Sequence, residues 1–247
     1  MISDQHADPR FNNDRADWLG RFLLDIKPDV VVNIGDGWDL SSLSSYDKGK
    51  ASFHGRSYRK DIDAGLDFQE RLWSPLRKAK KKLPYSYYLI GNHEERITRV
   101  LEHTPELEGT IGYDDLELDR YYDEVIPYEG GTPGKVEVDG IWYAHYFTSG
   151  IKGLPISGVN HARSLLDKMH VSATVGHSHL ADYAIESKPN GDKIQATVCG
   201  VYQDYRSPWA GASNDLWSRC IVVKREVENG NYDVQFVSIK ALEKEYA

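Results

Sequence analysis

Seven side chains with oxygen or nitrogen donor atoms recur at one kind of position, directly after a strand-like run of residues. They are Asp4, His6, Asp36, Asn92, His145, His177 and His179. Ligands of open α/β sheets bind at the carboxyl ends of the strands, so we expect these segments to meet at one rim. Imidazole, carboxylate and amide donors without thiolate suit Zn²⁺, Mn²⁺, Fe or Ni²⁺. The sequence therefore predicts a metal site assembled from distant segments.

The spacing of these residues favours two metal ions over one. Asp4 and His6 are two residues apart, as are His177 and His179, and residues i and i+2 of an extended segment point the same way. Seven donors exceed the needs of one tetrahedral ion, but they suit two ions that share a carboxylate. Two metals a few ångströms apart clamp a phosphoryl group during in-line displacement. The pattern therefore indicates chemistry on phosphate esters.

Helices and buried strands alternate in the first half of the chain and must position these residues. Apolar spacing predicts helices over 13–27, 58–82, 95–102 and about 114–124, and strands over 30–34 and 85–90. Pro75 is expected to bend or divide the second helix. The lysine run at 78 and 80–82 is interpreted as a solvated helix end.

The second half of the chain is richer in hairpins. Asp139-Gly140 predicts a hairpin between 136–138 and 141–144, and turns at Asn190-Gly191 and Asn229-Gly230 predict two more. A helix is expected over 159–169 and a strand over 172–175. Helices that alternate with strands, followed by hairpins, indicate an α/β layered protein. We expect a single domain over residues 1–247.

Composition excludes several classes of protein. Among 247 residues, 40% are hydrophobic and 28% are charged, which is typical of a globular chain. The sequence lacks an apolar run long enough for a membrane span and a recognisable secretion signal, so we expect a cytoplasmic protein with no membrane partner. The two cysteines, Cys199 and Cys220, are then expected as buried thiols, with a disulfide as the alternative. A net charge of −8 makes nucleic acid a possible but not a favoured partner.

Five motifs in order resemble the calcineurin-like metallophosphoesterase family, over about three quarters of the chain. They are Asp4-Gln5-His6, Gly35-Asp36-Gly37-Trp38-Asp39, Gly91-Asn92-His93-Glu94, His145 and Gly176-His177-Ser178-His179. The resemblance implies a layered α/β/β/α sandwich with mixed sheets and outer helices. It also implies hydrolysis of phosphate esters in a small substrate or a nucleotide, with phosphodiesters slightly favoured over monoesters.

The resemblance assigns roles to individual residues. The first metal would be held by Asp4, His6 and His179. The second metal would be held by Asn92, His145 and His177, and Asp36 would bridge both. The ions would be Mn, Fe, Zn or Ni, with Mn favoured, and a bridging water or hydroxide would be the nucleophile. His93 would assist the leaving group or orient the phosphate, and the Asp39 carboxylate would pair with His93 and raise its pKa.

Two departures from the family pattern bear on the site. Only residues 1–3 precede Asp4, so the first strand is short or an upstream piece is missing, and Asp4 and His6 are expected to be less well anchored. Leu40 stands where the protein-phosphatase branch carries a phosphate-gripping arginine, and Arg96 or Lys152 is a candidate replacement.

Alternatives stay open at this point. One is a nuclease that acts on single strands or ends, and another is a scaffold that keeps the fold without turnover. The aromatic segment 202–219, which contains Trp209 and Trp217, is interpreted as packing or as a source of substrate specificity.

Overall fold

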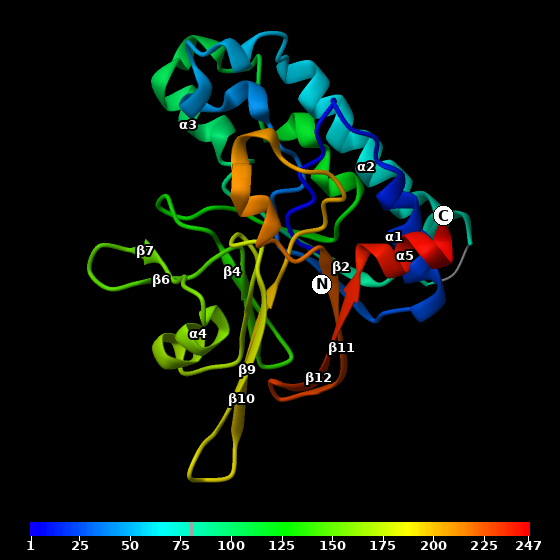
Figure 1. Cartoon of the computed structure of the whole chain (residues 1–247), viewed down its shortest axis with the longest axis vertical. Coiled ribbons are helices and arrows are strands. Elements are labelled where there is room, and N and C mark those ends of the chain that lie inside the picture. The colour runs from blue at the N-terminus through cyan, green and yellow to red at the C-terminus, as the bar shows by residue number, and fades with distance from the viewer. Residues whose placement is uncertain (80–81) are drawn as a thin grey trace.

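The chain has an α/β fold, and the computed structural model describes residues 1–79 and 82–247 (Figure 1). The first half contains α1 (Asp14–Ile26), β1 (Val30–Asn33), α2 (Tyr58–Lys78), β2 (Tyr85–Leu89), α3 (Arg96–His103) and β3 (Glu124–Ile126). The second half contains β4 (Lys135–Val138), β5 (Ile141–Ala144), β6 (Thr148–Ser149), β7 (Leu154–Pro155), α4 (His161–Met169), β8 (Ala173–Val175), β9 (Ala181–Ser187), β10 (Lys193–Cys199), β11 (Cys220–Glu228), β12 (Asn231–Ser238) and α5 (Ile239–Tyr246). Short 3-10 turns join several of these elements.

Two sheets carry most of the strands. Strands β1, β2 and β3 form a parallel sheet in that order, with Val31 opposite Ser86 and Tyr87 opposite Glu124. The second sheet has the order β4-β5-β8-β10-β9 and is mixed: β5, β8 and β10 run parallel, whereas β4 and β9 are antiparallel edge strands. Strands β11 and β12 form a separate antiparallel ribbon.

Alternation of side chains along the strands divides the core into layers. In β1, Val31 packs in the cluster that includes α1, α2 and α5, whereas Val32 packs with residues of β5, β10 and β11. In β10, Ala196 packs with α4, while Cys199 faces the other cluster. Each sheet therefore has helices on one face and apolar neighbours from the other strands on its opposite face.

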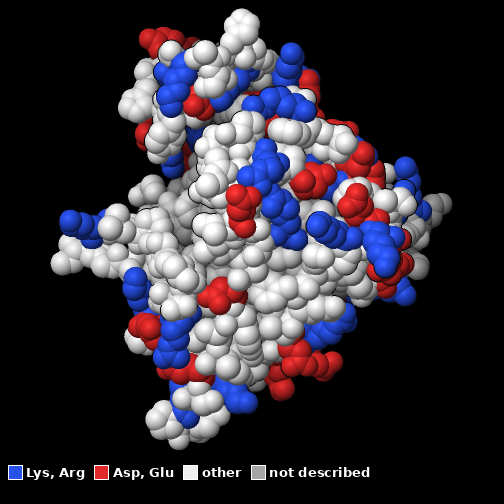
Figure 2. All heavy atoms as spheres, viewed as in Figure 1, with Lys and Arg blue, Asp and Glu red and all other residues white. Residues whose placement is uncertain are grey.

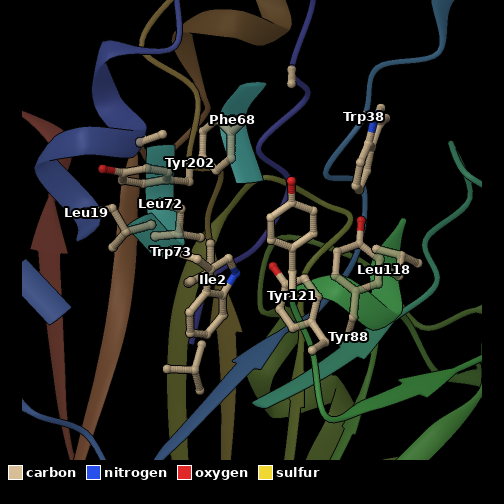
Figure 3. Packing of buried hydrophobic residues seen from close by; sticks show 14 of the residues in the cluster. Ile2, Leu19, Trp38, Phe68, Leu72, Trp73, Tyr88, Leu118, Tyr121 and Tyr202 are labelled. Atoms are coloured by element: carbon tan, nitrogen blue, oxygen red, sulfur yellow. The ribbon is translucent and has the colours of Figure 1, made fainter. Parts of the chain in front are cut away.

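The largest cluster lies under the helices that cover the parallel sheet. Figure 3 shows Leu19 of α1 close to Leu72 and Trp73 of α2, with Ile2 and Tyr202 beside them. Burial of such side chains contributes roughly 1.5–3 kcal/mol each. This cluster holds the N-terminal segment, and therefore the first predicted ligands, against the rest of the core.

Most predicted elements are confirmed, and the structure differs at a predicted helix near 114–124, at helix α2 and at α5. The predicted helix near 114–124 is wrong: two 3-10 turns, Tyr113–Leu116 and Leu118–Arg120, precede strand β3. The break between the turns is at Glu117, whose φ of 48° is incompatible with a continuous right-handed helix. Helix α2 is not divided at Pro75 but continues to Lys78. Ala79 and Lys82, which the prediction included, are not helical, and Lys80 and Lys81 lie outside the described residues. Helix α5 was not anticipated.

Two other expectations can be compared directly with the structure. Cys199 and Cys220 are both buried free thiols, as predicted. Within residues 1–79 and 82–247, the helices all fall short of the length and apolar character that a membrane crossing requires.

Candidate metal centre

The first group of predicted ligands combines Asp4 and His6 from the first of the five motifs with His179 from the last one. The Nε2 atom of His179 lies 3.2 Å from Oδ1 of Asp4 and 3.1 Å from Nε2 of His6. All three side chains are buried. Their ligand atoms lie within 4.8 Å of one another, which is the spacing that a single cation needs.

The second group contains the remaining four predicted ligands. Oδ2 of Asp36 lies 3.3 Å from Nε2 of His145, and the same nitrogen lies 3.0 Å from Oδ1 of Asn92. The Nδ1 atom of His177 is 3.2 Å from Nε2 of His145. Carboxylate, amide and imidazole donors thus converge from loops after β1, β2, β5 and β8.

Asp36 links the two groups. Its backbone carbonyl accepts a hydrogen bond from the backbone N–H of His6 (2.9 Å), and its carboxylate accepts one from the backbone N–H of His93 (2.8 Å). Charge interactions join Asp36 to Asp4 and His6 as well as to His145. The structure therefore brings all seven predicted ligand residues into one region, where Asn92 and His177 are half-buried and the other five are buried.

Several of these residues have a left-handed backbone, which residues other than glycine rarely adopt. Twelve non-glycine residues of the described chain have positive φ, and five of them are predicted ligands. These are Asp4 (51°), His6 (45°), Asp36 (53°), His177 (64°) and His179 (60°). Such conformations each cost on the order of 1–3 kcal/mol and cluster at functional sites. Strain is thus concentrated at the candidate ligands.

The N-terminal segment is anchored more firmly than expected. Ile2 pairs with Asn33 in a parallel bridge, and the backbone N–H of Asp4 donates to the carbonyl of Gly35 (3.1 Å). The Tyr205 hydroxyl donates to the carbonyl of His6. The expectation that Asp4 and His6 would be weakly held is therefore wrong, because hydrogen bonds from two other segments replace a longer strand.

Neighbouring groups fix how the ligands point. Nδ1 of His145 donates to the carbonyl of Ile34 (2.7 Å), which leaves Nε2 as the free ligand atom. The Asp39 carboxylate lies 3.6 Å from Nδ1 of His6, on the side of the ring away from Asp4 and His179. The hydrogen bond to Ile34 sets the tautomer and orientation of His145, whereas the Asp39 carboxylate is too far from Nδ1 of His6 for a hydrogen bond.

The chemistry of the donor set fits divalent cations. Oδ1 of Asp4 and Nδ1 of His6 are buried side-chain atoms without a hydrogen-bond partner among the described residues. An unpartnered buried carboxylate oxygen is costly, and a cation between Asp4, His6 and His179 would satisfy it. In the other group, burial tends to lower the pKa of His145, but the nearby Asp36 carboxylate outweighs it and raises this pKa to about 9. Without a cation, a proton on His145 compensates Asp36.

His93 lies beside the ligands but is held differently from the prediction. Its Nδ1 donates to the backbone carbonyl of Asp39 (2.7 Å), while the Asp39 carboxylate oxygen is 3.5 Å away. Nε2 of His93 accepts a hydrogen bond from the Arg96 guanidinium (3.1 Å). Burial and the Arg96 charge hold the pKa of His93 well below its usual range, so the expected rise in this pKa is wrong. Lys152, the other candidate phosphate clamp, is exposed in the turn between β6 and β7.

Glu94 is a positioning residue whose role the sequence did not disclose. Its carboxylate accepts hydrogen bonds from the backbone N–H groups of Asp36 (3.0 Å), Trp38 (3.1 Å) and Gly91 (2.9 Å), and from the Tyr88 hydroxyl (2.9 Å). Burial raises its pKa to about 7. Glu94 therefore ties the loop after β1 to the loop after β2. The only signal in the sequence is its place directly after Asn92-His93.

The aromatic segment 202–219 serves both packing and the site, and Figure 1 draws it in orange above the upper ends of the strands. Tyr202 is fully buried in the core. Trp217 contacts the His179 ring edge-to-face at a centroid distance of 4.3 Å, and Trp209 lies 5.6 Å from Trp217. A row of rings thus leads from a candidate ligand to the surface.

Comparison with known proteins adds no further assignment. No family model matches the chain, and no curated protein matches its sequence significantly.

Proposed function

We propose that this protein is a two-metal phosphoesterase of the calcineurin-like kind, with phosphodiesters slightly favoured over monoesters as substrates. One observation carries the proposal: seven donor residues from five segments, five of them buried and two half-buried, converge in two groups, and five of the seven have a left-handed backbone. Strain of this kind is retained where the arrangement has a use. Mere packing of polar residues does not require it.

The fold supports the same interpretation. The parallel sheet packs against α1, α2 and α5, and the mixed sheet packs against α4, with apolar residues of both sheets sharing a third cluster. This is the order of layers expected for a metallophosphoesterase sandwich. Ligands that follow the carboxyl ends of β1, β2, β5 and β8 agree with the usual position of sites in α/β sheets.

The proposed ligand sets follow the two groups. Asp4, His6 and His179 would hold one divalent cation. Asn92, His145 and His177 would hold the other, and Asp36 would contribute to both. When bound, the cations supply a water of lowered pKa and neutralise charge on the phosphate oxygens. Nitrogen and oxygen donors without thiolate favour Mn, Fe, Zn or Ni over softer ions.

The chain itself contributes His93 and Arg96 to the reaction. Because Nδ1 of His93 donates to the Asp39 carbonyl, its Nε2 is the remaining ring nitrogen, 3.1 Å from Arg96 and 3.8 Å from Oδ2 of Asp36. The guanidinium is held at its other nitrogen by the carbonyl of Asp39 (2.7 Å). Arg96 orients a phosphate and stabilises negative charge that develops on the leaving oxygen, and His93 holds the guanidinium in place by accepting its hydrogen bond at Nε2. The protein-phosphatase branch carries a phosphate-gripping arginine at the position of Leu40, and Arg96 supplies that function here.

Removal and return of metal tests the proposal. The purified protein is stripped with a chelator, and hydrolysis of methyl 4-nitrophenyl phosphate and 4-nitrophenyl phosphate is measured after addition of Mn²⁺, Ni²⁺, Zn²⁺ or Mg²⁺. We expect loss of both activities and their return with at least one ion, together with calorimetric binding of two ions per chain. If the protein binds the ions but hydrolyses neither ester with any of them, the proposal is wrong and the protein is a scaffold without turnover.

A further inference from the structure

A cavity of about 630 Å³ opens directly beside His93 and Asp39. Its wall is built from the 3-10 turns after β1, from the start of α3, from Arg10 and from Trp209 of the aromatic segment. The volume lies within the range of ordinary ligand pockets. We propose that this cavity binds the nucleoside of a nucleotide substrate together with a second phosphate; this inference rests on the proposed function.

The charge of the cavity favours an anion beyond the reacting phosphate. Four basic residues line it against two acidic ones: Arg10, Lys50, Arg56 and Arg96 against Asp39 and Asp47. This local excess of positive charge contrasts with the net charge of −8 of the whole chain. On the face drawn in Figure 2, acidic and basic side chains are interspersed and form no continuous basic stripe. The cavity therefore suits a compact anion better than a long nucleic-acid backbone.

Two of these cations present their charge to solvent. Arg56 is held inside the protein, because its Nη2 lies 2.9 Å from Oδ2 of Asp47 and its guanidinium donates to the carbonyls of Ser41 and Ser52. The Lys50 side chain is instead 62% exposed, with Nζ 3.6 Å from Asp47, and the Arg10 side chain is 46% exposed. Lys50 is thus the cation most available to a second phosphate. Nε and Nη2 of Arg10 donate to the Asp8 carboxylate, so Arg10 offers its Nη1 beside Lys50. Arg96 remains beside His93 for the reacting one.

The aromatic residues of the cavity favour a flat ring. Tyr46 is 80% exposed and Trp209 is 57% exposed, although both are large apolar side chains. Trp209 continues the row of rings that begins at His179 and Trp217. Stacking of a base on such a ring strengthens binding about 5- to 150-fold. A phosphorylated protein segment would fit these two exposed rings less well than a nucleobase.

Three diesters that share one leaving group test the proposal. They are methyl 4-nitrophenyl phosphate, thymidine 5′-(4-nitrophenyl phosphate) and its 3′-phosphorylated form. In each, water forms a new P–O bond as the bond to 4-nitrophenolate breaks. We expect kcat/KM to rise about tenfold with the thymidine and again about fivefold with the second phosphate. W209A should reduce the first gain, and K50Q and R10K the second. L216A and K193Q change exposed residues outside the cavity and serve as matched controls.

A binding measurement separates this proposal from the proposed function. Calorimetry with thymidine 3′,5′-bisphosphate on chelator-treated protein should show binding that W209A and K50Q weaken and that L216A and K193Q retain. If the bisphosphate binds in this way but no ester is hydrolysed, the proposed function fails and the cavity assignment stands. If all three diesters react with equal kcat/KM in every variant, or if a phosphoserine peptide is preferred to them, the nucleotide assignment is overturned.

Discussion

The Nδ1 atom of His93 lies 2.7 Å from the backbone carbonyl oxygen of Asp39 and 3.5 Å from its carboxylate oxygen. The main chain, and not the acidic side chain, therefore fixes the tautomer of His93. The carboxylate lies between this ring and the ring of His6, 3.6 Å from Nδ1 of His6. Asp39 thus acts on His93 through its backbone, while its carboxylate lies beside the His6 ring of the metal centre without a hydrogen bond to it.

The first prediction follows from this division. D39N retains the carbonyl that holds His93, so we expect kcat to fall by less than about tenfold. H93A removes the imidazole that holds Arg96 and should lower kcat by roughly 10²–10³-fold. Metal stoichiometry, measured by calorimetry, should remain two ions in H93A. A larger loss in D39N than in H93A would show that the carboxylate is the essential partner.

Glu94 provides the second prediction. In E94Q, one acceptor oxygen becomes an NH₂ group that faces donors from Asp36, Trp38 or Gly91. We expect the free energy of unfolding to fall by about 2–4 kcal/mol, measured by urea denaturation of metal-free protein. E102Q, on exposed α3 surface, is the matched control and should change it by less than about 0.5 kcal/mol. If E94Q and E102Q unfold at the same midpoint concentration of urea, Glu94 does not position the two loops.

The third prediction concerns the close approach of Gly91 to Asp36. A Cβ atom at position 91 would lie 2.2 Å from Oδ1 and 2.4 Å from the backbone nitrogen of Asp36. G91A must therefore displace Asp36, and we expect the affinity for both metal ions to fall roughly 10- to 100-fold. G112A is the control, because a Cβ there meets only one atom, at 3.9 Å. Unchanged metal affinity in G91A would mean that Asp36 is not a shared ligand.

Local sequence patterns predicted the placement of the candidate ligands well. The β-branched run before Asp36 and the aromatic run before Asn92 each become a buried strand, and Asp139-Gly140 forms its hairpin turn with φ of 51° and 79°. These features depend on residues adjacent in the chain. Side-chain donors that directly follow such strands must reach the same rim, so their convergence could be inferred from order alone.

Other features depend on contacts that a linear pattern does not encode. Strand β3 has three residues and exists because it pairs with β2, while its sequence resembles the acidic segment around it. The partner of His93 is a main-chain carbonyl, and every residue type supplies one. The cavity combines Arg10, residues 39–56 and Trp209, so only the folded chain shows that these cations and rings are neighbours.

Lys224 gives a prediction about stability and pH. Its Nζ lies 4.0 Å from the ring centroid of Tyr232 and 4.8 Å from that of Tyr143, and it donates to the Thr174 hydroxyl. Burial lowers the pKa of Lys224 from 10.5 to about 7. Between these two values the unfolded chain binds the proton more strongly than the folded protein. The contribution of Lys224 to the free energy of unfolding must therefore rise with pH from about 7 to about 10.5.

K224M tests this linkage, because methionine keeps the length of the side chain without its titration. We expect K224M to gain stability relative to the unmodified protein at pH 7, and this advantage should shrink by on the order of a few kcal/mol as the pH rises to 10. The measurement is urea denaturation of both proteins at half-unit pH steps. K240M, at an exposed position on α5, controls for the loss of one positive charge. If the difference in the free energy of unfolding between K224M and the unmodified protein stays constant from pH 7 to 10, Lys224 keeps its ordinary pKa. The two tyrosine rings and Thr174 would then compensate its burial.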